Sequence, residues 1–289
     1  VKMKIINLKA EKKIEAEIKK IKNIQKETNF DLEEYIPSVN YIERAFYSNV
    51  ERILETGFTP YLVGDSGTGK TAFAEWYGNK NRKPLLIVNC DYKNLRELLG
   101  NWSLENGATG PITIFRAGLL TKFLTSPTVI LFDEVNSLEG EYLFFLHELL
   151  NNKKVFIPEM SYVFPVVATI ILASNPTGRV YHGTQPLNFA LLSRVVVVDV
   201  PHWTEEELKK IIKDEEIIRF YKEANEMSQK EQLGLFIGIR ELLQYQALSK
   251  VLGKGEAIKV AFLNKVKCVD LDIAATFKGL ASAVFGVEL

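Results

Sequence analysis

The stretch GDSGTGKT at residues 64–71 constrains this chain more than any other, because it follows an apolar run and precedes a helix-forming segment. It matches G-x-x-x-x-G-K-[ST], in which the glycines let backbone N–H groups turn inward around a polyphosphate. We expect Lys70 to contact the β- and γ-phosphates of ATP and Thr71 to bind Mg²⁺. A turn with a chance lysine is the alternative, and the flanking strand and helix patterns disfavour it. The residues expected to bind the nucleotide are Gly64, Asp65, Ser66, Gly67, Thr68, Gly69, Lys70 and Thr71.

Short apolar runs recur after this point and indicate buried strands. Near-continuous apolar runs are typical of strands buried on both faces of a parallel sheet. They predict an α/β fold: a three-layer P-loop NTPase with a five-stranded parallel sheet and its ligand at the carboxyl ends of the strands. A helix over 38–56, ended by Gly57, is expected before the first strand. The predicted strands are 59–63, 85–88, 128–132, 168–173 and 195–199.

The remaining sequence predicts three regions. Residues 1–34 form a Lys/Ile-rich helical arm, which either packs on the main domain or binds a partner or neighbouring subunit. Residues 35–202 form the α/β domain. From Thr204 onward the strand signals end and helical patterns dominate, so residues 203–289 are predicted to form a small all-helical lid domain, with breaks at the glycines. Those glycines are Gly234, Gly238 and Gly253.

Composition excludes several classes of protein. The 36 basic and 36 acidic residues give zero formal net charge, so overall charge does not argue for a nucleic-acid or membrane partner. Two cysteines and three histidines without metal-ligand spacing predict a reducing, cytoplasmic compartment and no structural zinc. The longest apolar run, 163–173, is about half the ~20 residues that span a bilayer. We therefore predict no membrane span.

Carboxylates and an amide follow two of the predicted strands. The segment VILFDEVNSL at 129–138 ends an apolar strand with Asp133 and Glu134. We expect Asp133 to hold Mg²⁺ and Glu134 to polarise the attacking water. Asn175 follows the strand at 168–173 and would hydrogen-bond the water and the γ-phosphate. A helix-capping acid pair and an Asn-Pro turn are the ordinary alternatives.

Two arginines are candidate phosphate contacts. Arg194 stands at the start of an apolar strand, where a cation is costly to bury, so we expect it to reach a neighbouring subunit's phosphate as an arginine finger. Arg179 competes for this role, and a surface ion pair is the ordinary alternative for both. Arg240 lies in the first turn of a predicted lid helix, where the helix dipole disfavours a cation. A γ-phosphate between the domains would compensate for that position.

The order of these motifs resembles the AAA+ ATPases. Within them the sequence is most similar to the MoxR group, in particular its CbbQ/NorQ-like branch, and to the wider dynein-related set. The resemblance covers about residues 35–246 and includes 84–120, 147–159 and 186–194. The chain departs from the family pattern at Val195, where Phe is usual.

The resemblance implies a role for each motif. Residues 64–71 correspond to Walker A, Asp133 with Glu134 to Walker B, and Asn175 to sensor 1. Arg194 corresponds to the trans finger and Arg240 to sensor 2. It further implies a homo-oligomeric ring, usually a hexamer, that remodels a protein complex, often with a separate von Willebrand A-domain partner.

Two hairpin insertions, at about 101–116 and 153–166, are expected from the resemblance to face the pore or one ring surface. Trp102, Tyr162 and Phe164 would grip a target segment there, or pack the hairpins together.

The leading hypothesis is a Mg-dependent ATPase that acts as a MoxR-type remodelling chaperone. The alternative is a nucleic-acid-linked motor or loader, to which the pair at 153–154 would contribute lysines. A scaffold that binds ATP but scarcely hydrolyses it is disfavoured by the presence of Glu134 and Asn175.

Overall fold

The computed structural model describes residues 31–38, 42–90, 98–107, 110–138, 140–157, 162–177 and 187–288. The predicted arm lies outside the described residues up to residue 30, as does Arg179. The described part begins with a 3-10 helix, η1 (Leu32–Tyr35), capped by Asp31, whose carboxylate accepts a hydrogen bond from the Glu33 N–H. None of the helices in the described ranges has the length and apolar character needed to cross a membrane.

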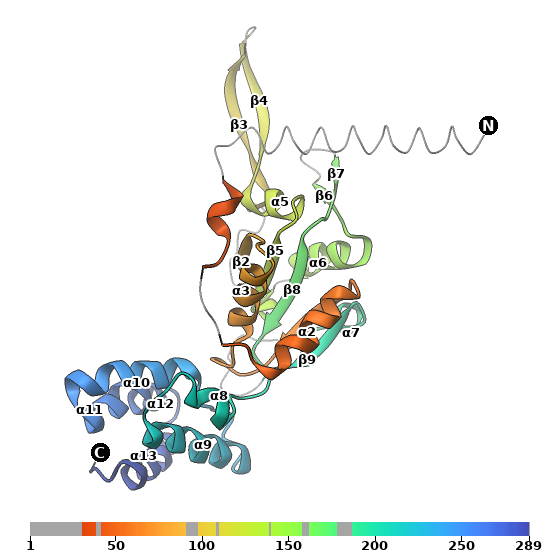
Figure 1. Cartoon of the computed structure of the whole chain (residues 1–289). Helices are drawn as coiled ribbons and strands as arrows, with labels where there is room; N and C mark the ends of the chain where they lie inside the picture. The colour runs from red at the N-terminus through yellow and green to blue at the C-terminus, as the bar shows by residue number, and fades with distance from the viewer. Residues whose placement is uncertain are drawn as a thin grey trace. The chain divides into compact units, whose positions relative to one another are not determined.

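Five parallel strands form the central sheet, which confirms the fold predicted from the apolar runs (Figure 1). Leu85 pairs with Val129 and Tyr61 with Leu172, so neighbouring strands end at the same edge of the sheet. Flanking helices and a helical C-terminal region complete the α/β P-loop NTPase fold. The order across the sheet is β2 (Leu85–Asn89), β5 (Val129–Asp133), β8 (Thr169–Ser174), β1 (Thr59–Val63) and β9 (Val195–Asp199).

Burial differs between the central and outer strands. β5, β8 and β1 are buried along most of their length, as expected for strands covered on both faces. β9 is an edge strand and is only partly covered, with Val197 48% exposed. An apolar run alone does not distinguish an edge strand from a central one, because strand order is a property of the whole fold.

The chain divides into two compact units. Unit 1 comprises 1–39, 74–171 and 189–195, and unit 2 comprises 40–73, 172–188 and 196–289. Strand β8 and helix α3 (Lys70–Lys80) each contribute residues to both. The domain boundaries at residues 35 and 203 stay predictions.

Unit 1 carries two antiparallel hairpins, where insertions were expected. β3 (Gly100–Gly107) pairs with β4 (Gly110–Ala117) in a long ribbon that extends from the region of α5 (Figure 1). β6 (Lys154–Ile157) pairs with β7 (Tyr162–Pro165). Trp102 lies opposite Phe115 with ring centroids 5.5 Å apart. Unit 1 also contains η1, β2 and β5, together with the helices α5 (Leu119–Leu124), η2 (Val135–Ser137), α6 (Gly140–Asn152) and α7 (Phe189–Leu192).

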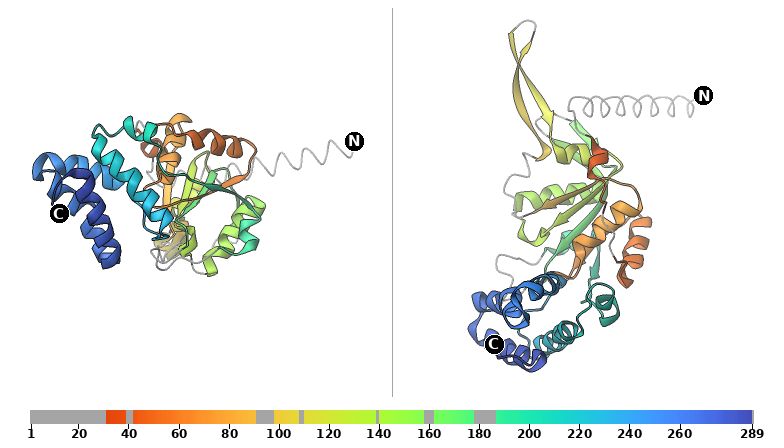
Figure 2. Two further views of the ribbon diagram at one scale, coloured as in Figure 1. Left: turned by 90° about the horizontal axis from the view of Figure 1, so that it is seen from below. Right: turned by 60° about the vertical axis from the view of Figure 1, so that its left-hand side comes forward.

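Unit 2 contains the segment 64–71 and helices α8 to α13, referred to below as the lid helices. These helices are the teal to blue elements near the C-terminus in Figure 2. The lid core is aromatic: Phe220 contacts Phe262 and Phe285, and Phe262 contacts Phe277. The predicted glycine breaks are observed, with Gly238 as the N-cap of α10 and Gly253 between α10 and α11. These helices are α8 (Glu205–Lys209), α9 (Glu215–Lys230), α10 (Ile239–Leu252), α11 (Lys254–Ile258), η4 (Lys259–Leu263), α12 (Asn264–Val269) and α13 (Leu271–Phe285).

The helix predicted over 38–56 begins later than expected. Helix α2 spans Ala45–Glu55, and Gly57 follows it with a left-handed φ of 81°. Arg44 is extended, with φ −98° and ψ 153°, and the residue is buried, only 2% exposed. The start of α2 is therefore set by a buried side chain that is held by distant parts of unit 2.

Candidate functional site

The segment 64–71 forms the predicted loop after β1 and the start of α3. Gly67 and Gly69 have φ angles of 77° and 94°, a region in which residues with a Cβ are strained. At Gly67 space is also restricted, since a Cβ there would lie 2.8 Å from Gly238 Cα. The loop thus needs glycine both for its own turn and for its contact with the start of α10.

Lys70 lies folded against this loop. Its Nζ donates hydrogen bonds to Gly64 O at 2.6 Å, to Asp65 O at 3.0 Å and to Asn175 Oδ1 at 3.0 Å. An ammonium group has three donors, so this arrangement uses all of them. The lysine and the amide that were predicted from separate motifs, 105 residues apart, therefore meet within unit 2.

The first turn of α10 contacts the same loop. The Ile239 N–H donates to Gly67 O at 3.4 Å. Arg240, the next residue, is exposed and makes no hydrogen bond or ion pair with any described residue. A cation at a helix N-terminus is electrostatically disfavoured, so the position favours an anion as its partner. Arg240 thus lies in the first turn of α10, next to the residue that contacts the loop, and its role at a phosphate stays a prediction.

In unit 1, Asp133 ends β5 and Glu134 follows it in a strained conformation. Glu134 has φ 57° and ψ 38°, the left-handed region, which costs a residue with a Cβ about 1–2 kcal/mol. Its N–H donates to Asp133 Oδ1 at 3.0 Å. Backbone strain of this kind is often found at functional sites.

Cys90 adjoins the two carboxylates. Its N–H donates to Asp133 O at 2.8 Å, and its side chain is buried. Burial raises the pKa of the Cys90 thiol, and the negative charges of Asp133 and Glu134 raise it further. The thiol is therefore held protonated and unreactive beside the acidic pair.

Arg194 follows α7 in unit 1 and bends back onto it. Its Nη1 donates to Ala190 O, while its Nε is buried without a hydrogen-bond partner among the described residues. Burial lowers the pKa of His147 on α6, and the nearby charge of Arg194 lowers it further. The expectation that Arg194 reaches a neighbouring copy concerns an assembly and stays a prediction.

Sequence reasoning missed a cluster that surrounds the loop in unit 2. Arg44, His202, Trp203 and Glu207 all lie there. His202 Nε2 is 3.1 Å from Asp65 Oδ2, and Trp203 Nε1 donates to Gly67 O at 2.9 Å. The only local signal was Thr204-x-x-Glu207, the spacing of a capping box, which the structure contains. That spacing identifies the start of a helix but not its tertiary contacts.

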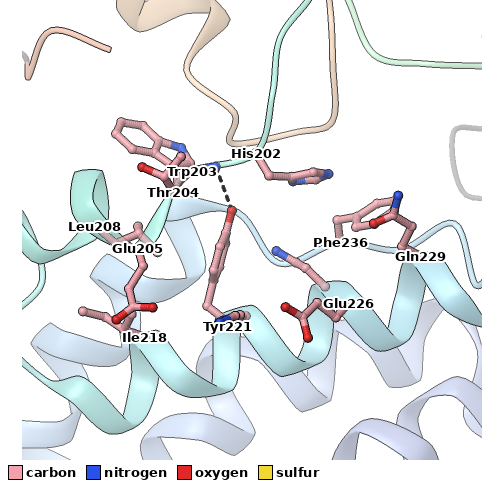
Figure 3. Close-up of a pocket in the computed structure, with 12 residues that line it drawn as sticks. His202, Trp203, Thr204, Glu205, Leu208, Ile218, Tyr221, Glu226, Gln229 and Phe236 are labelled. Carbon is pink, nitrogen blue, oxygen red and sulfur yellow. Dashed lines mark hydrogen bonds between the residues drawn. The ribbon is translucent and has the colours of Figure 1, made fainter. Parts of the chain in front are cut away.

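The lid also contains a pocket of about 390 Å³ (Figure 3). The Trp203 N–H donates to the Tyr221 hydroxyl across its wall at 3.0 Å, and burial raises the pKa of Tyr221 to about 12. No site residue predicted from the sequence lines it. Its lining includes His202, Trp203, Tyr221, Asn225, Gln229 and Phe236.

Glu207 is expected to give the protein acid-sensitive stability. Burial raises its pKa, but hydrogen bonds from Arg44 and the Thr204 N–H, with the charge of Arg44, outweigh burial and place the pKa below its ordinary value. A carboxylate whose pKa is lowered on folding stabilises the fold at pH values above its pKa in the unfolded chain, about 4.3. This stabilisation is lost as the pH falls through its pKa in the folded protein. We expect the unfolding temperature of the wild type to exceed that of Glu207→Gln at pH 7.

The gap between the two unfolding temperatures should shrink below about pH 4, because protonated Glu207 no longer pairs with Arg44. Thermal unfolding measured between pH 3 and 7 tests this. Glu231→Gln, at an exposed position, is the matched control and should match the wild type throughout. A wild-type to Glu207→Gln gap that stayed constant with pH would contradict the expectation.

In a comparison with known protein families, residues 61–195 match the model of the AAA domain, dynein-related subfamily. Protein YojN of Bacillus subtilis strain 168 is 32% identical over 179 residues, which are 57% of this chain and 57% of YojN. Proteins SAB1265c and SAUSA300_1302 of Staphylococcus aureus, strains bovine RF122 / ET3-1 and USA300, are each 28% identical over 237 residues, or 76% of this chain and 89% of theirs. The names of these relatives describe no activity.

Proposed function

We propose that this chain hydrolyses ATP as an AAA+ ATPase. The match of residues 61–195 to the AAA domain supports an AAA+ ATPase. The glycine-rich loop between β1 and α3, with its buried lysine, supports the binding of a nucleoside triphosphate. Proteins with this domain commonly form rings and typically bind ATP with Mg²⁺.

The described residues fit a polyphosphate and its metal ion. Gly67 and Gly69 provide the turn that aims backbone N–H groups inward, and Lys70 provides a cation. The Thr71 hydroxyl and the Asp133 carboxylate are oxygen ligands of the kind Mg²⁺ prefers, and we assign them to it. Mg²⁺, when bound, supplies charge that offsets the phosphate oxygens.

The other residues receive roles in hydrolysis. Glu134 polarises the attacking water, and Asn175 orients it with the γ-phosphate. Arg240 contacts the γ-phosphate from the lid, and Arg194 stabilises the transition state from a neighbouring subunit. The observation that carries this proposal is the 3.0 Å contact between Lys70 Nζ and Asn175 Oδ1, since both groups would serve the terminal phosphate.

Lys70→Ala is expected to weaken binding of Mg-ATP by about a hundredfold, because it removes a charge-assisted contact worth up to about 3 kcal/mol. Titration calorimetry with the full chain measures this directly. Lys250→Ala is the matched control, because Lys250 is an exposed lysine of α10. Equal affinities for the wild type and Lys70→Ala would contradict the assignment of the loop.

We further propose a MoxR-type remodelling chaperone that works as a ring, usually a hexamer, on a protein complex. A von Willebrand A-domain protein is a suitable partner. The β3–β4 hairpin supports a protein target, because Trp102, Leu104 and Ile112 on it are 53%, 74% and 44% exposed. Exposed apolar side chains of this kind mark protein contacts.

The alternative, a nucleic-acid-linked motor, has less support from the same hairpin. Nucleic-acid binding depends on Lys and Arg contacts to phosphates. In the described part of β3 and β4 the only basic residue is Arg116, and it is paired with Glu105. ATP turnover stimulated by DNA or RNA, and lost at high salt, would reverse this preference.

A further inference from the structure

A buried arginine lies directly behind the phosphate loop. The Arg44 guanidinium donates to Glu207 Oε2 from Nε at 3.1 Å and from Nη2 at 3.0 Å. Nη2 also donates to Pro201 O at 3.1 Å and His202 O at 2.9 Å, and Nη1 donates to Thr68 O. One side chain thus joins the loop, the segment before the lid and the first lid helix.

Glu207 ties this arginine to two helix starts. Its Oε2 also accepts from the Thr204 N–H at 3.0 Å, which caps α8. Its Oε1 accepts from the Ala45 N–H at 3.4 Å, at the first residue of α2. The carboxylate is therefore held from both sides, and any displacement of α8 would move the partner of Arg44.

Trp203 reinforces the contact. The Arg44 guanidinium lies 4.2 Å from the centre of the Trp203 ring, a cation–π geometry. Trp203 Nε1 donates to Gly67 O at 2.9 Å. Two consecutive loop carbonyls, those of Gly67 and Thr68, are therefore held by side chains from outside the loop.

Holding these carbonyls determines where the next N–H groups point. In a planar trans peptide the C=O and the following N–H point in opposite directions. Because Arg44 binds Thr68 O, the Gly69 N–H is turned away from Arg44. A phosphate loop binds its ligand through N–H groups aimed to one side, so the orientation of this peptide matters for affinity.

We propose that Arg44 is a positioning residue for the phosphate loop, which fixes the 68–69 peptide for phosphate binding and couples that peptide to α8 through Glu207. The inference rests on the proposed nucleotide binding. It adds that affinity for the nucleotide depends on the lid through this contact. A movement of α8 that withdraws Glu207 would release the Thr68 carbonyl and weaken phosphate binding.

The competing view is that Arg44 only stabilises the fold. Loss of Arg44 would then lower the unfolding temperature, while the folded protein would bind nucleotide normally. To distinguish the two views, nucleotide affinity and the unfolding temperature are measured on the same samples. The variants keep the positive charge of residue 44 or the aromatic ring of residue 203.

The experiment uses the full chain with Mg²⁺ and a fluorescent N-methylanthraniloyl ATP. In Arg44→Lys a single ammonium nitrogen replaces the planar guanidinium. It cannot reach Thr68 O, Glu207 and the carbonyls of residues 201 and 202 at the same time. We expect Kd to rise about tenfold or more, with kcat at saturating ATP within about threefold of wild type. Trp203→Phe, which keeps a ring but removes the side-chain donor to Gly67 O, should shift Kd in the same direction.

Glu207→Gln should raise Kd less than Arg44→Lys does, because it weakens the anchor but leaves the contact to Thr68. Arg219→Lys is the control, since Arg219 is an exposed arginine of α9, and its Kd should equal that of the wild type.

Lower unfolding temperatures with wild-type Kd values in all three test variants would overturn the inference and leave nucleotide binding intact. A wild type that fails to bind the fluorescent ATP would instead overturn the proposed function. If Arg44→Lys does not fold, Trp203→Phe and Glu207→Gln decide the question.

Discussion

Glu134→Gln is expected to reduce ATP turnover by about 10²–10⁴-fold while Mg-ATP still binds with nearly wild-type affinity. A general base in this position contributes a factor of that size, and glutamine removes the charge without changing the shape of the side chain. Gln also has the same backbone preferences as Glu at φ 57°, so the strain at residue 134 should be unchanged. Steady-state phosphate release and titration calorimetry measure the two quantities separately.

Glu55→Gln is the matched control for this variant, because Glu55 is an exposed glutamate at the end of α2. Its turnover should equal that of the wild type. If Glu134→Gln retained turnover within about threefold of wild type, Glu134 would not be the base, and the strained turn after β5 would need another explanation.

Arg194→Ala is expected to reduce turnover by about 10³-fold or more, because an arginine finger contributes a factor of this size by stabilising charge in the transition state. Mixing it with Glu134→Gln should restore activity if the arginine acts between subunits. In a randomly mixed ring, half the sites keep Glu134 and half the neighbours supply Arg194. About a quarter of the wild-type turnover is therefore expected.

The control is a mixture of Glu134→Gln with the double variant Glu134→Gln/Arg194→Ala, in which no site has a base, so no activity should return. Absence of recovery in the first mixture, with both variants assembled and binding ATP, would show that Arg194 is not the trans finger. Arg179→Ala would then be tested in the same way. In the structure Arg194 donates to Ala190 O of the preceding helix α7, so reaching a neighbour would cost at least that hydrogen bond.

Much of the fold was predictable because its elements depend on local patterns. The strands predicted at 59–63 and 195–199 match β1 and β9, and the other three lie within one residue of their observed bounds. The breaks at Gly238 and Gly253 are also found, since a cap requires particular backbone angles at one residue. The order of strands across the sheet did not follow from these patterns.

The features that the sequence did not predict involve residues whose burial and contacts depend on partners far away in the chain. Helix α2 starts at Ala45 because Arg44 is drawn into a buried ion pair with Glu207, 163 residues away. Val197 reads as a core residue but lies on the edge strand β9, partly exposed. Neither the start of α2 nor the exposure of Val197 can be predicted from the ten or twenty residues around it in the sequence.

The sequence by itself therefore determined the elements and the chemistry of the loop, because apolar periodicity, glycine and the Lys70-Thr71 pair act through neighbouring residues. Only the tertiary structure decided that Arg44 and Trp203 hold two loop carbonyls, across 24 and 136 residues of chain. The physical reason is burial. A polar side chain inside a protein must satisfy its hydrogen bonds with whatever the fold brings beside it, and the fold is a property of the whole chain.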